Sequence, residues 1–229
     1  MTRQTIHAKG SEVISRIPKT QPFFLDEDIP LILDDIRAVL KSGRLILGPY
    51  TQQFEKDFQE YCGVKYAVAV SSCTSALEIV LRYFDVAGKE VILPTNTFIA
   101  TANAVTYSAG KPVLTDIDPD TLCMCPDDML RKMTPNTCGV IVVHIAGLID
   151  PAIQRIRQVC RERGIFMIED ASHAHGATLS GEKAGNLGNA GCFSMYPTKV
   201  MTTSTGGMIT TNDEGLAEYA VSLRHHGVG

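Results

Sequence analysis

The sequence lacks long hydrophobic runs and long runs of basic residues. No apolar stretch approaches the roughly 18 residues that a membrane helix needs, and the first 25 residues contain no apolar signal-peptide core. The formal net charge is -4, so nucleic acid is not an expected partner. We therefore expect a cytoplasmic protein that binds neither membranes nor nucleic acids.

Cysteine patterns typical of disulfide frames and zinc sites are also missing. The seven cysteines are an odd number, scattered through segments with the pattern of strands and helices, so we expect reduced thiols. Cys123 and Cys125 are the only close pair, and they lack the second Cys/His cluster of a structural zinc site. His173 and His175 form an H-x-H pair without a third ligand. No metal is predicted, although this pair leaves the alternative open.

Two nucleotide-binding signatures are absent as well. The glycines at 181, 185, 188 and 191 do not form G-x-G-x-x-G, and they precede a predicted strand instead of following one. No Walker lysine pattern exists. Dinucleotide binding is therefore disfavoured. A nucleotide-binding module that uses the turn at Ser71–Ser75 remains an alternative.

What the chain does contain is a regular alternation of strands and helices. Its 229 residues are 45% hydrophobic and 20% charged, which fits one globular domain after an arm over residues 1–25. Near-continuous apolar strands between helices predict a mostly parallel sheet covered on both faces. Strands are expected at 66–70, 90–93, 112–116, 139–143, 165–168, 190–195 and 207–211, and helices at 29–40, 51–61, 97–108, 127–133, 151–163 and 213–225, with one more opening at 71–75.

Lys199 follows the strand at 190–195 in a loop of Ser, Thr and Gly. Partial burial without a neighbouring anion lowers the pKa of a lysine, and such an amine can attack a carbonyl. For a lysine considered alone, a solvated surface position is the commoner outcome.

The turn at 71–75 contains four hydroxyl side chains and one thiol next to a predicted helix start. Free backbone N–H groups and the helix dipole favour an anion there. An ordinary N-cap, which needs one hydroxyl, is the alternative. Cys73 could also be an activated thiol, because helix N-termini lower the pKa of cysteine.

Glu169 and Asp170 follow an apolar run at the carboxyl end of a predicted strand. Open parallel sheets bind ligands at this edge. Successive strand residues alternate faces, so at most one of the two acids should point into a given site. Exposure of both acids to solvent is the alternative, and His144 is expected at the same edge as a satisfied polar residue.

One cofactor uses all of these groups together, namely pyridoxal 5'-phosphate (PLP). Its aldehyde needs a lysine amine, and its ring nitrogen needs a carboxylate to stay protonated. Its phosphate needs N–H and hydroxyl donors, and its flat ring gains from an aromatic neighbour such as Phe98.

The sequence also resembles a known family. The motifs that carry the resemblance are Gly48-Pro49, Ala67–Ser72, Pro94–Thr101, Ile168–Gly176 and Phe193–Lys199. They are similar to those of the DegT/DnrJ/StrS family of sugar aminotransferases, which has the aspartate-aminotransferase fold. The resemblance implies a three-layer α/β/α PLP-binding large domain over residues 26–229, with the C-terminal small domain of the family absent from this chain.

Carried over residue by residue, the resemblance implies these roles. Lys199 would form the internal aldimine, Asp170 would pair with the pyridine nitrogen, and His173 would lie by the ring hydroxyl. The remaining cofactor contacts would come from Phe98, which would stack on the ring, and from Cys73, Thr74 and Ser194, which would hold the phosphate.

The implied reaction transfers an amino group from glutamate or glutamine to a keto-sugar nucleotide, in a homodimer that serves polysaccharide or antibiotic sugar biosynthesis. Lys199 argues against the dehydratase branch of the family, which has His there. Many relatives have Gly at the position of Cys73 and a carboxylate where this chain has Ser204-Thr205. A truncated relative that binds PLP and dimerises without turnover remains the alternative.

Overall fold

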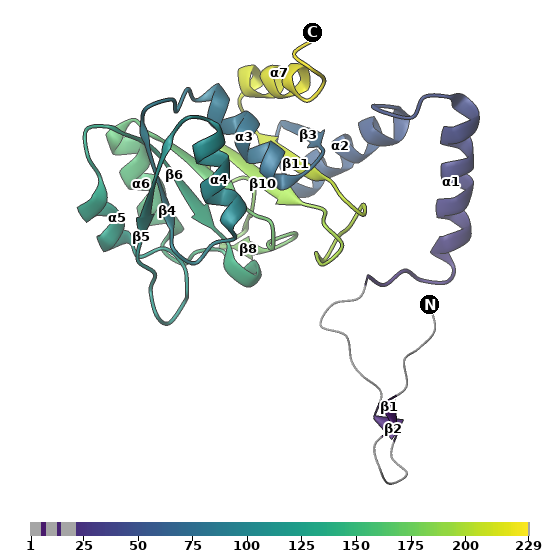
Figure 1. The fold of residues 1–229 in the computed structure, drawn as a ribbon, viewed down its shortest axis with the longest axis horizontal. Coiled ribbons are helices and arrows are strands. Elements are labelled where there is room, and N and C mark those ends of the chain that lie inside the picture. The colour runs from purple at the N-terminus through teal and green to yellow at the C-terminus, as the bar shows by residue number, and fades with distance from the viewer. Residues whose placement is uncertain (1–5, 8–12, 15–21, 229) are drawn as a thin grey trace.

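The centre of the protein is a seven-stranded sheet. A computed structural model describes residues 6–7, 13–14 and 22–228. The strands of the sheet are β3 (Tyr66–Val70), β4 (Glu90–Pro94), β5 (Lys111–Thr115), β6 (Thr137–Val143), β7 (Phe166–Asp170), β10 (Ala190–Ser194) and β11 (Gly207–Thr211). Their spatial order is β3-β11-β10-β7-β6-β4-β5 (Figure 1). The pairs from β10 to β5 are all parallel, which confirms the mostly parallel sheet.

Helices cover both faces of the sheet, so the predicted three-layer α/β/α architecture is confirmed. Leu77 and Ile168 belong to the buried cluster of one face, and Phe58 and Met167 belong to that of the other. Because Met167 and Ile168 are neighbours in β7, they show the alternation of a strand buried on both sides. The first face is covered by α3 (Cys73–Tyr83), α4 (Ile99–Tyr107) and α7 (Glu214–Leu223), and the second by α2 (Pro49–Cys62), α5 (Pro126–Lys132) and α6 (Ile153–Arg163).

The exception to the parallel pattern is β11, which runs antiparallel to both β10 and β3. Residues 195–206 join β10 to β11 without a helix, whereas a parallel connection needs a crossover. This loop therefore begins and ends at the same edge of the sheet. Lys199 lies within it, close to the carboxyl ends of the parallel strands.

Some local details differ from the sequence-based expectation. The helix expected to start after Thr51 starts at Pro49, with Gly48 as its N-cap residue. Proline suits the first helical position because its missing N–H would have no partner there. The short elements η1 (Ile145–Gly147), β8 (Thr178–Leu179) and β9 (Glu182–Lys183) were not predicted, because two or three residues carry no readable periodicity.

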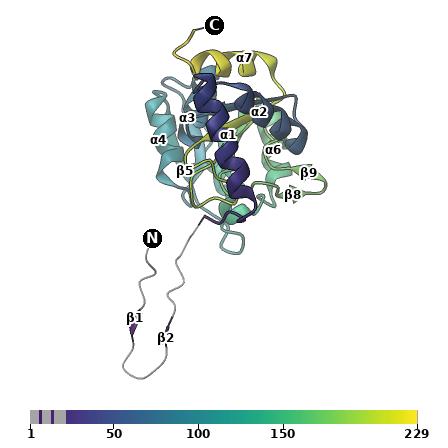
Figure 2. The ribbon, with the colours of Figure 1, turned by 90° about the vertical axis from the view of Figure 1, so that its right-hand side faces the viewer.

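Most of the arm predicted over residues 1–25 lies outside the described residues. Within it, β1 (Ile6–His7) pairs antiparallel with β2 (Val13–Ile14). The following α1 (Asp28–Ser42) has no buried residue; it stands apart from the sheet in Figure 1 and crosses in front of it in Figure 2. In the described part of the chain, no helix has the length and apolarity needed to cross a membrane. The exposed apolar side chains of α1 are Ile29, Leu31, Ile32, Leu33, Ile36 and Leu40.

An ion pair satisfies backbone groups on the exposed side of the edge strand β3. Glu55 of α2 accepts the backbone N–H of Ala69 at 2.9 Å, and Arg224, just after α7, donates to the Ala69 carbonyl at 3.1 Å. The two side chains also pair with each other. Unpaired strand edges invite association with other strands, and here both backbone groups of Ala69 are satisfied. The pair also fixes β3 just before the chain turns at Ser71.

Candidate active site

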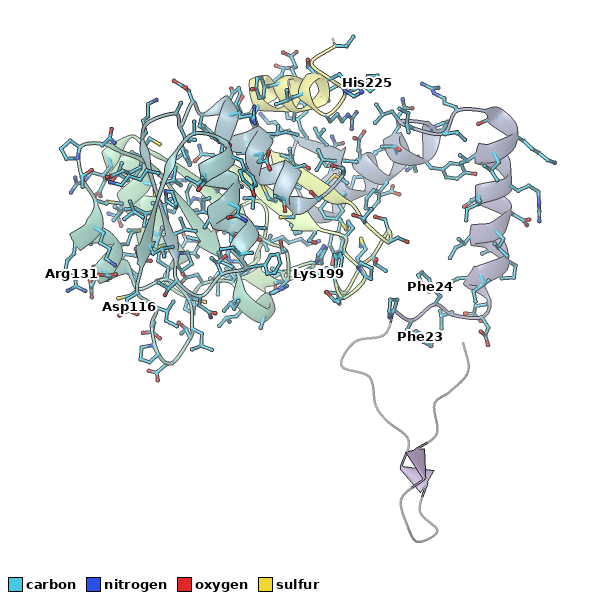
Figure 3. All side chains as sticks on the ribbon, in the orientation of Figure 1. Phe23, Phe24, Asp116, Arg131, Lys199 and His225 are labelled. Carbon is cyan, nitrogen blue, oxygen red and sulfur yellow. The ribbon has the colours of Figure 1, made fainter. Side chains whose placement is uncertain are left out.

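A cavity of about 520 Å³ lies beyond the carboxyl ends of β6, β7 and β10. This volume is within the usual range for small-molecule sites. Figure 3 shows Lys199 at this end of the sheet. The cavity is lined by all seven residues that the sequence singled out, namely Cys73, Thr74, Phe98, Asp170, His173, Ser194 and Lys199. The structure therefore brings the candidates together, while their roles stay predictions.

Lys199 is half-buried in the loop between β10 and β11, and its backbone N–H donates to the Tyr196 carbonyl at 2.9 Å. Burial lowers the pKa of Lys199, and the nearby Asp170 and Cys73 oppose that shift. The lowered direction agrees with the sequence-based prediction, but the expected absence of a neighbouring anion is wrong, because Asp170 is close by. A larger share of the amine is then unprotonated near neutral pH, which is the form that attacks a carbonyl.

The two adjacent acids face opposite sides of the sheet, as strand alternation predicts. Asp170 is buried and faces the cavity. Glu169 is fully buried on the other side, where its carboxylate accepts three backbone N–H groups at 2.7–2.8 Å, those of Gly185, Leu187 and Gly188. The ring nitrogen Nε2 of His144 lies 2.9 Å from the same carboxylate, so His144 is the satisfied polar residue that we expected. Only Asp170 is available to a ligand in the cavity.

Asp170 is held by contacts that the sequence analysis missed. Its Oδ2 accepts a hydrogen bond of 2.7 Å from the hydroxyl of Thr101, which is fully buried in α4. Its Oδ1 accepts the backbone N–H of Ser172 at 3.2 Å. The sequence did contain one indication of this contact, a threonine inside the alanine-rich segment 99–107. A buried hydroxyl needs a polar partner, so this threonine could have been expected to bond a polar side chain.

The first turn of α3 offers free donors to the cavity. Ser72 is the N-cap residue and accepts the backbone N–H of Ser75 at 3.0 Å. The backbone N–H groups of Cys73 and Thr74 donate to no protein group among the described residues. Gly207 of β11 approaches this turn so closely that a Cβ there would lie 2.4 Å from the Ser72 carbonyl carbon. The site can thus receive an anion at a helix N-terminus.

Phe98 and His173 complete the cavity wall. Phe98 precedes α4, lines the cavity and is 75% exposed. The Nδ1 of His173 accepts the backbone N–H of Ala146 at 3.3 Å. Burial and Lys199 lower the pKa of His173, which favours a neutral ring. With Nδ1 used as the acceptor, the proton of the neutral ring is on Nε2, and that group can donate to a ligand.

The activated-thiol alternative for Cys73 is wrong. Burial and the Asp170 carboxylate raise its pKa well above the usual cysteine value, although a hydrogen bond from Ser172 and the charge of Lys199 oppose this. A raised pKa disfavours the thiolate, which is the reactive form of cysteine. All seven cysteines are free thiols. Among the described residues, no group of three His, Cys, Asp or Glu side chains could hold a metal ion.

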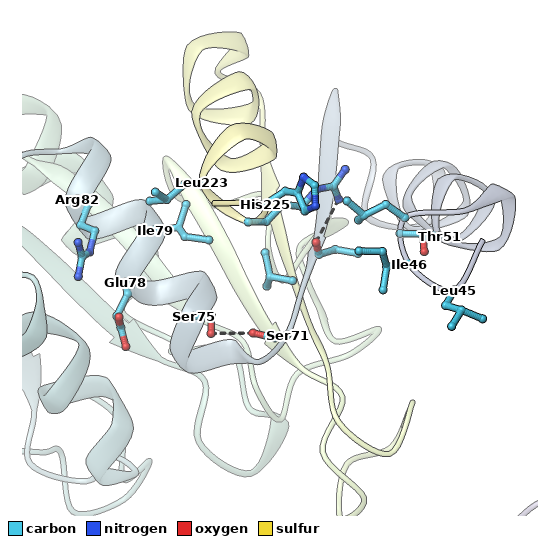
Figure 4. A pocket seen from close by; sticks show the side chains of 14 residues that line it. Leu45, Ile46, Thr51, Ser71, Ser75, Glu78, Ile79, Arg82, Leu223 and His225 are labelled. Atoms are coloured by element: carbon cyan, nitrogen blue, oxygen red, sulfur yellow. Dashed lines mark hydrogen bonds between the residues drawn. The ribbon is translucent and has the colours of Figure 1, made fainter. Parts of the chain in front are cut away.

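A second hollow, of about 620 Å³, lies on the other side of the Ser71–Ser75 turn (Figure 4). The hydroxyls of Ser71 and Ser75 face it and bond each other at 3.0 Å. Leu45, Ile46 and His225 also line it. None of the seven candidate residues does. Serines 71 and 75 are thus directed away from the candidate active site, so that only part of the hydroxyl-rich turn faces it.

Comparison with known proteins identifies a family that matches this chain. The DegT/DnrJ/EryC1/StrS aminotransferase family matches residues 27–229. The spore coat polysaccharide biosynthesis protein SpsC of Bacillus subtilis is 40% identical over 210 residues, covering 90% of this chain and 54% of the relative. GDP-perosamine synthase of Caulobacter vibrioides is 42% identical over 207 residues, covering 89% and 53%.

Solved structures show the same likeness. PseC of Helicobacter pylori, an aminotransferase involved in the biosynthesis of pseudoaminic acid, superimposes with a TM-score of 0.85 at 29% identity. The match covers 92% of this chain and 56% of that protein. The chain spans about half the length of the curated relatives it matches.

Proposed function

The chain belongs to the DegT/DnrJ/EryC1/StrS aminotransferase family, and on that basis we propose that it binds PLP and transfers an amino group from glutamate or glutamine to a keto-sugar nucleotide. One observation carries the proposal. Lys199 with its lowered pKa, buried Asp170 and the open first turn of α3 line a single cavity. These are the amine, the acid and the anion site that PLP requires.

The two charged residues take different tasks. The amine of Lys199 would hold the cofactor through its aldehyde, and the same amine would act as general base and acid toward the α carbon of the amino donor. Asp170 would hold the pyridine nitrogen and keep it protonated. When bound, PLP supplies the electron sink for the amino-transfer reaction. Burial of Asp170 strengthens its interaction with a cationic ring.

The remaining residues orient the cofactor. The free backbone N–H groups of Cys73 and Thr74, with the hydroxyls of Thr74 and Ser194, hold the phosphate at the dipole of α3. Phe98 would provide an aromatic wall for the ring. The Nε2 proton of His173 would be the donor for the ring hydroxyl. All of these groups line the cavity.

The substrate class is inferred from the relatives. Proteins similar to this chain are named for polysaccharide biosynthesis and for the synthesis of GDP-perosamine, which is a nucleotide sugar. A keto-sugar nucleotide is therefore the proposed acceptor. Because both proposed substrates are intracellular metabolites, the cytoplasm is the proposed location.

The first half-reaction tests the amino-donor side of the proposal without knowledge of the sugar. We expect the purified protein to take up PLP with visible absorbance, and L-glutamate or L-glutamine to abolish that absorbance by converting the cofactor to its amine form. Addition of a keto-sugar nucleotide should restore it. PLP uptake without conversion by either donor would support the non-catalytic alternative, and binding of a nucleotide without any PLP uptake would refute the proposal.

We also propose that the protein forms a homodimer. The apolar side chains of α1 are exposed, for example Leu31 at 64% and Leu40 at 65%, and so are Leu45 and Ile46 in the following loop. Exposed apolar patches of this extent mark interaction surfaces. Sedimentation equilibrium should give twice the chain mass, and Leu40→Glu should shift the equilibrium toward the monomer. A wild-type protein that stays monomeric at high concentration would contradict the dimer.

A further inference from the structure

Thr101 is a buried polar residue at the cavity wall that the proposed function has not used. It lies in α4 with no exposed surface, and its hydroxyl donates to Asp170 Oδ2 at 2.7 Å. The other oxygen, Oδ1, has weaker partners, with the Ser172 N–H at 3.2 Å and the Cys73 sulfur at 4.0 Å. Thr101 therefore makes the strongest contact that fixes the direction of this carboxylate.

Thr97 forms a hydrogen bond with Thr101. The hydroxyls of Thr97 and Thr101 lie 2.7 Å apart. The single hydroxyl proton of Thr101 goes to the carboxylate, so Thr97 must donate the bond that the two hydroxyls share. Two hydroxyls aligned in this way polarise each other and strengthen the final bond to Asp170.

The start of α4 also positions Phe98, which lies between the two threonines in sequence. One rigid segment thus sets both the aromatic wall and the direction of the carboxylate. A site held by packed and hydrogen-bonded support keeps its geometry more accurately than one whose side chains rotate freely.

We propose that Thr101 is a positioning residue, which aims the Asp170 carboxylate at the pyridine nitrogen of PLP with Thr97 as its support. The inference rests on the proposed function, because it requires PLP in the cavity. In this proposal Thr101 acts through Asp170, to which its hydroxyl donates.

Substitutions in α4 test the inference by PLP affinity, read from the visible absorbance of the bound cofactor. Thr101→Val keeps the shape but removes the hydroxyl, and it should weaken PLP binding about tenfold, as expected for one hydrogen bond to a charged group. Thr101→Ser keeps the hydroxyl and should stay within about threefold of wild type. Thr106→Val removes an exposed hydroxyl of the same helix, bonded to the Ala102 carbonyl at 3.2 Å, and should change nothing.

A double-mutant cycle separates positioning from a general structural role. In the Asp170→Asn background, Thr101→Val should cost much less than in wild type, because the residue it acts through has changed. Thermal unfolding of the cofactor-free variants should stay close to that of their parents. An equal loss of affinity in both backgrounds, or an unchanged affinity in Thr101→Val, overturns the inference. Failure of the wild type to take up PLP would instead overturn the proposed function.

Discussion

Replacing Lys199 by alanine should abolish covalent attachment of PLP and reduce amino transfer by roughly 10³-fold or more, since one group serves as nucleophile and as proton carrier. Lys199 lines the cavity together with Asp170. Burial lowers its pKa, so the amine reacts more readily with an aldehyde near neutral pH than a solvated lysine does. The fold should be unaffected, because the side chain is half-buried in a loop.

Borohydride reduction followed by peptide mass mapping provides the measurement. In the wild type, reduction should fix the cofactor to the peptide that contains Lys199. The matched control is Lys132→Ala, which removes a lysine that pairs with Asp128 on α5 and should keep the modified peptide. A reducible adduct that persists in Lys199→Ala would mean that another amine holds the cofactor.

Replacing Glu169 by alanine should destabilise the protein by about 4 kcal/mol, because buried amides would lose a charged acceptor. The carboxylate accepts the N–H groups of Gly185, Leu187 and Gly188 at 2.7–2.8 Å. His144 adds a fourth contact at 2.9 Å: its Nδ1 accepts the Asp150 N–H at 3.4 Å, so Nε2 carries the proton and donates. No solvent reaches Glu169, so water cannot replace these bonds.

The loss should appear as a melting temperature lower by on the order of 10 °C and as faster amide exchange at 185, 187 and 188. Glu169→Gln should be milder, because Leu187 and Gly188 both donate to the single oxygen Oε1, which an amide oxygen can replace. Asp170→Asn is the neighbouring control and should leave the melting temperature nearly unchanged while weakening PLP binding. Equal stability of Glu169→Ala and wild type would contradict the buried-anchor role.

The pair at 169–170 shows how far local sequence rules reach. Strand alternation predicts that two adjacent acids at a strand end face opposite sides. It does not say which of them enters the site, because both positions are equally acidic. Packing decides this: Asp170 shares the face of Ile168 beneath α3, and Glu169 shares the face of Met167, where the loop at 185–188 arrives. The partner amides are contributed by residues up to 19 positions away.

Thr101 and the antiparallel β11 were not predicted for related reasons. A threonine in an alanine-rich helix has no visible partner in the sequence, since Asp170 is 69 residues away. The direction of β11 depends on the absence of a crossover helix in residues 195–206, and that loop has a Ser-, Thr- and Gly-rich sequence around Lys199 in place of a helix signal. The cavity itself depends on the spatial order of strands that are distant in sequence.

The sequence by itself determined the main helices and strands, the layered α/β/α class and the set of side chains proposed to bind PLP, because periodicity and motif spacing are local properties of the chain. Only the tertiary structure showed why Asp170 and not Glu169 faces the cavity, that burial raises the pKa of the Cys73 thiol, and that Thr101 supports Asp170. Burial, pKa and hydrogen-bond partners depend on groups that folding brings together from distant parts of the chain, and no local pattern records those distances.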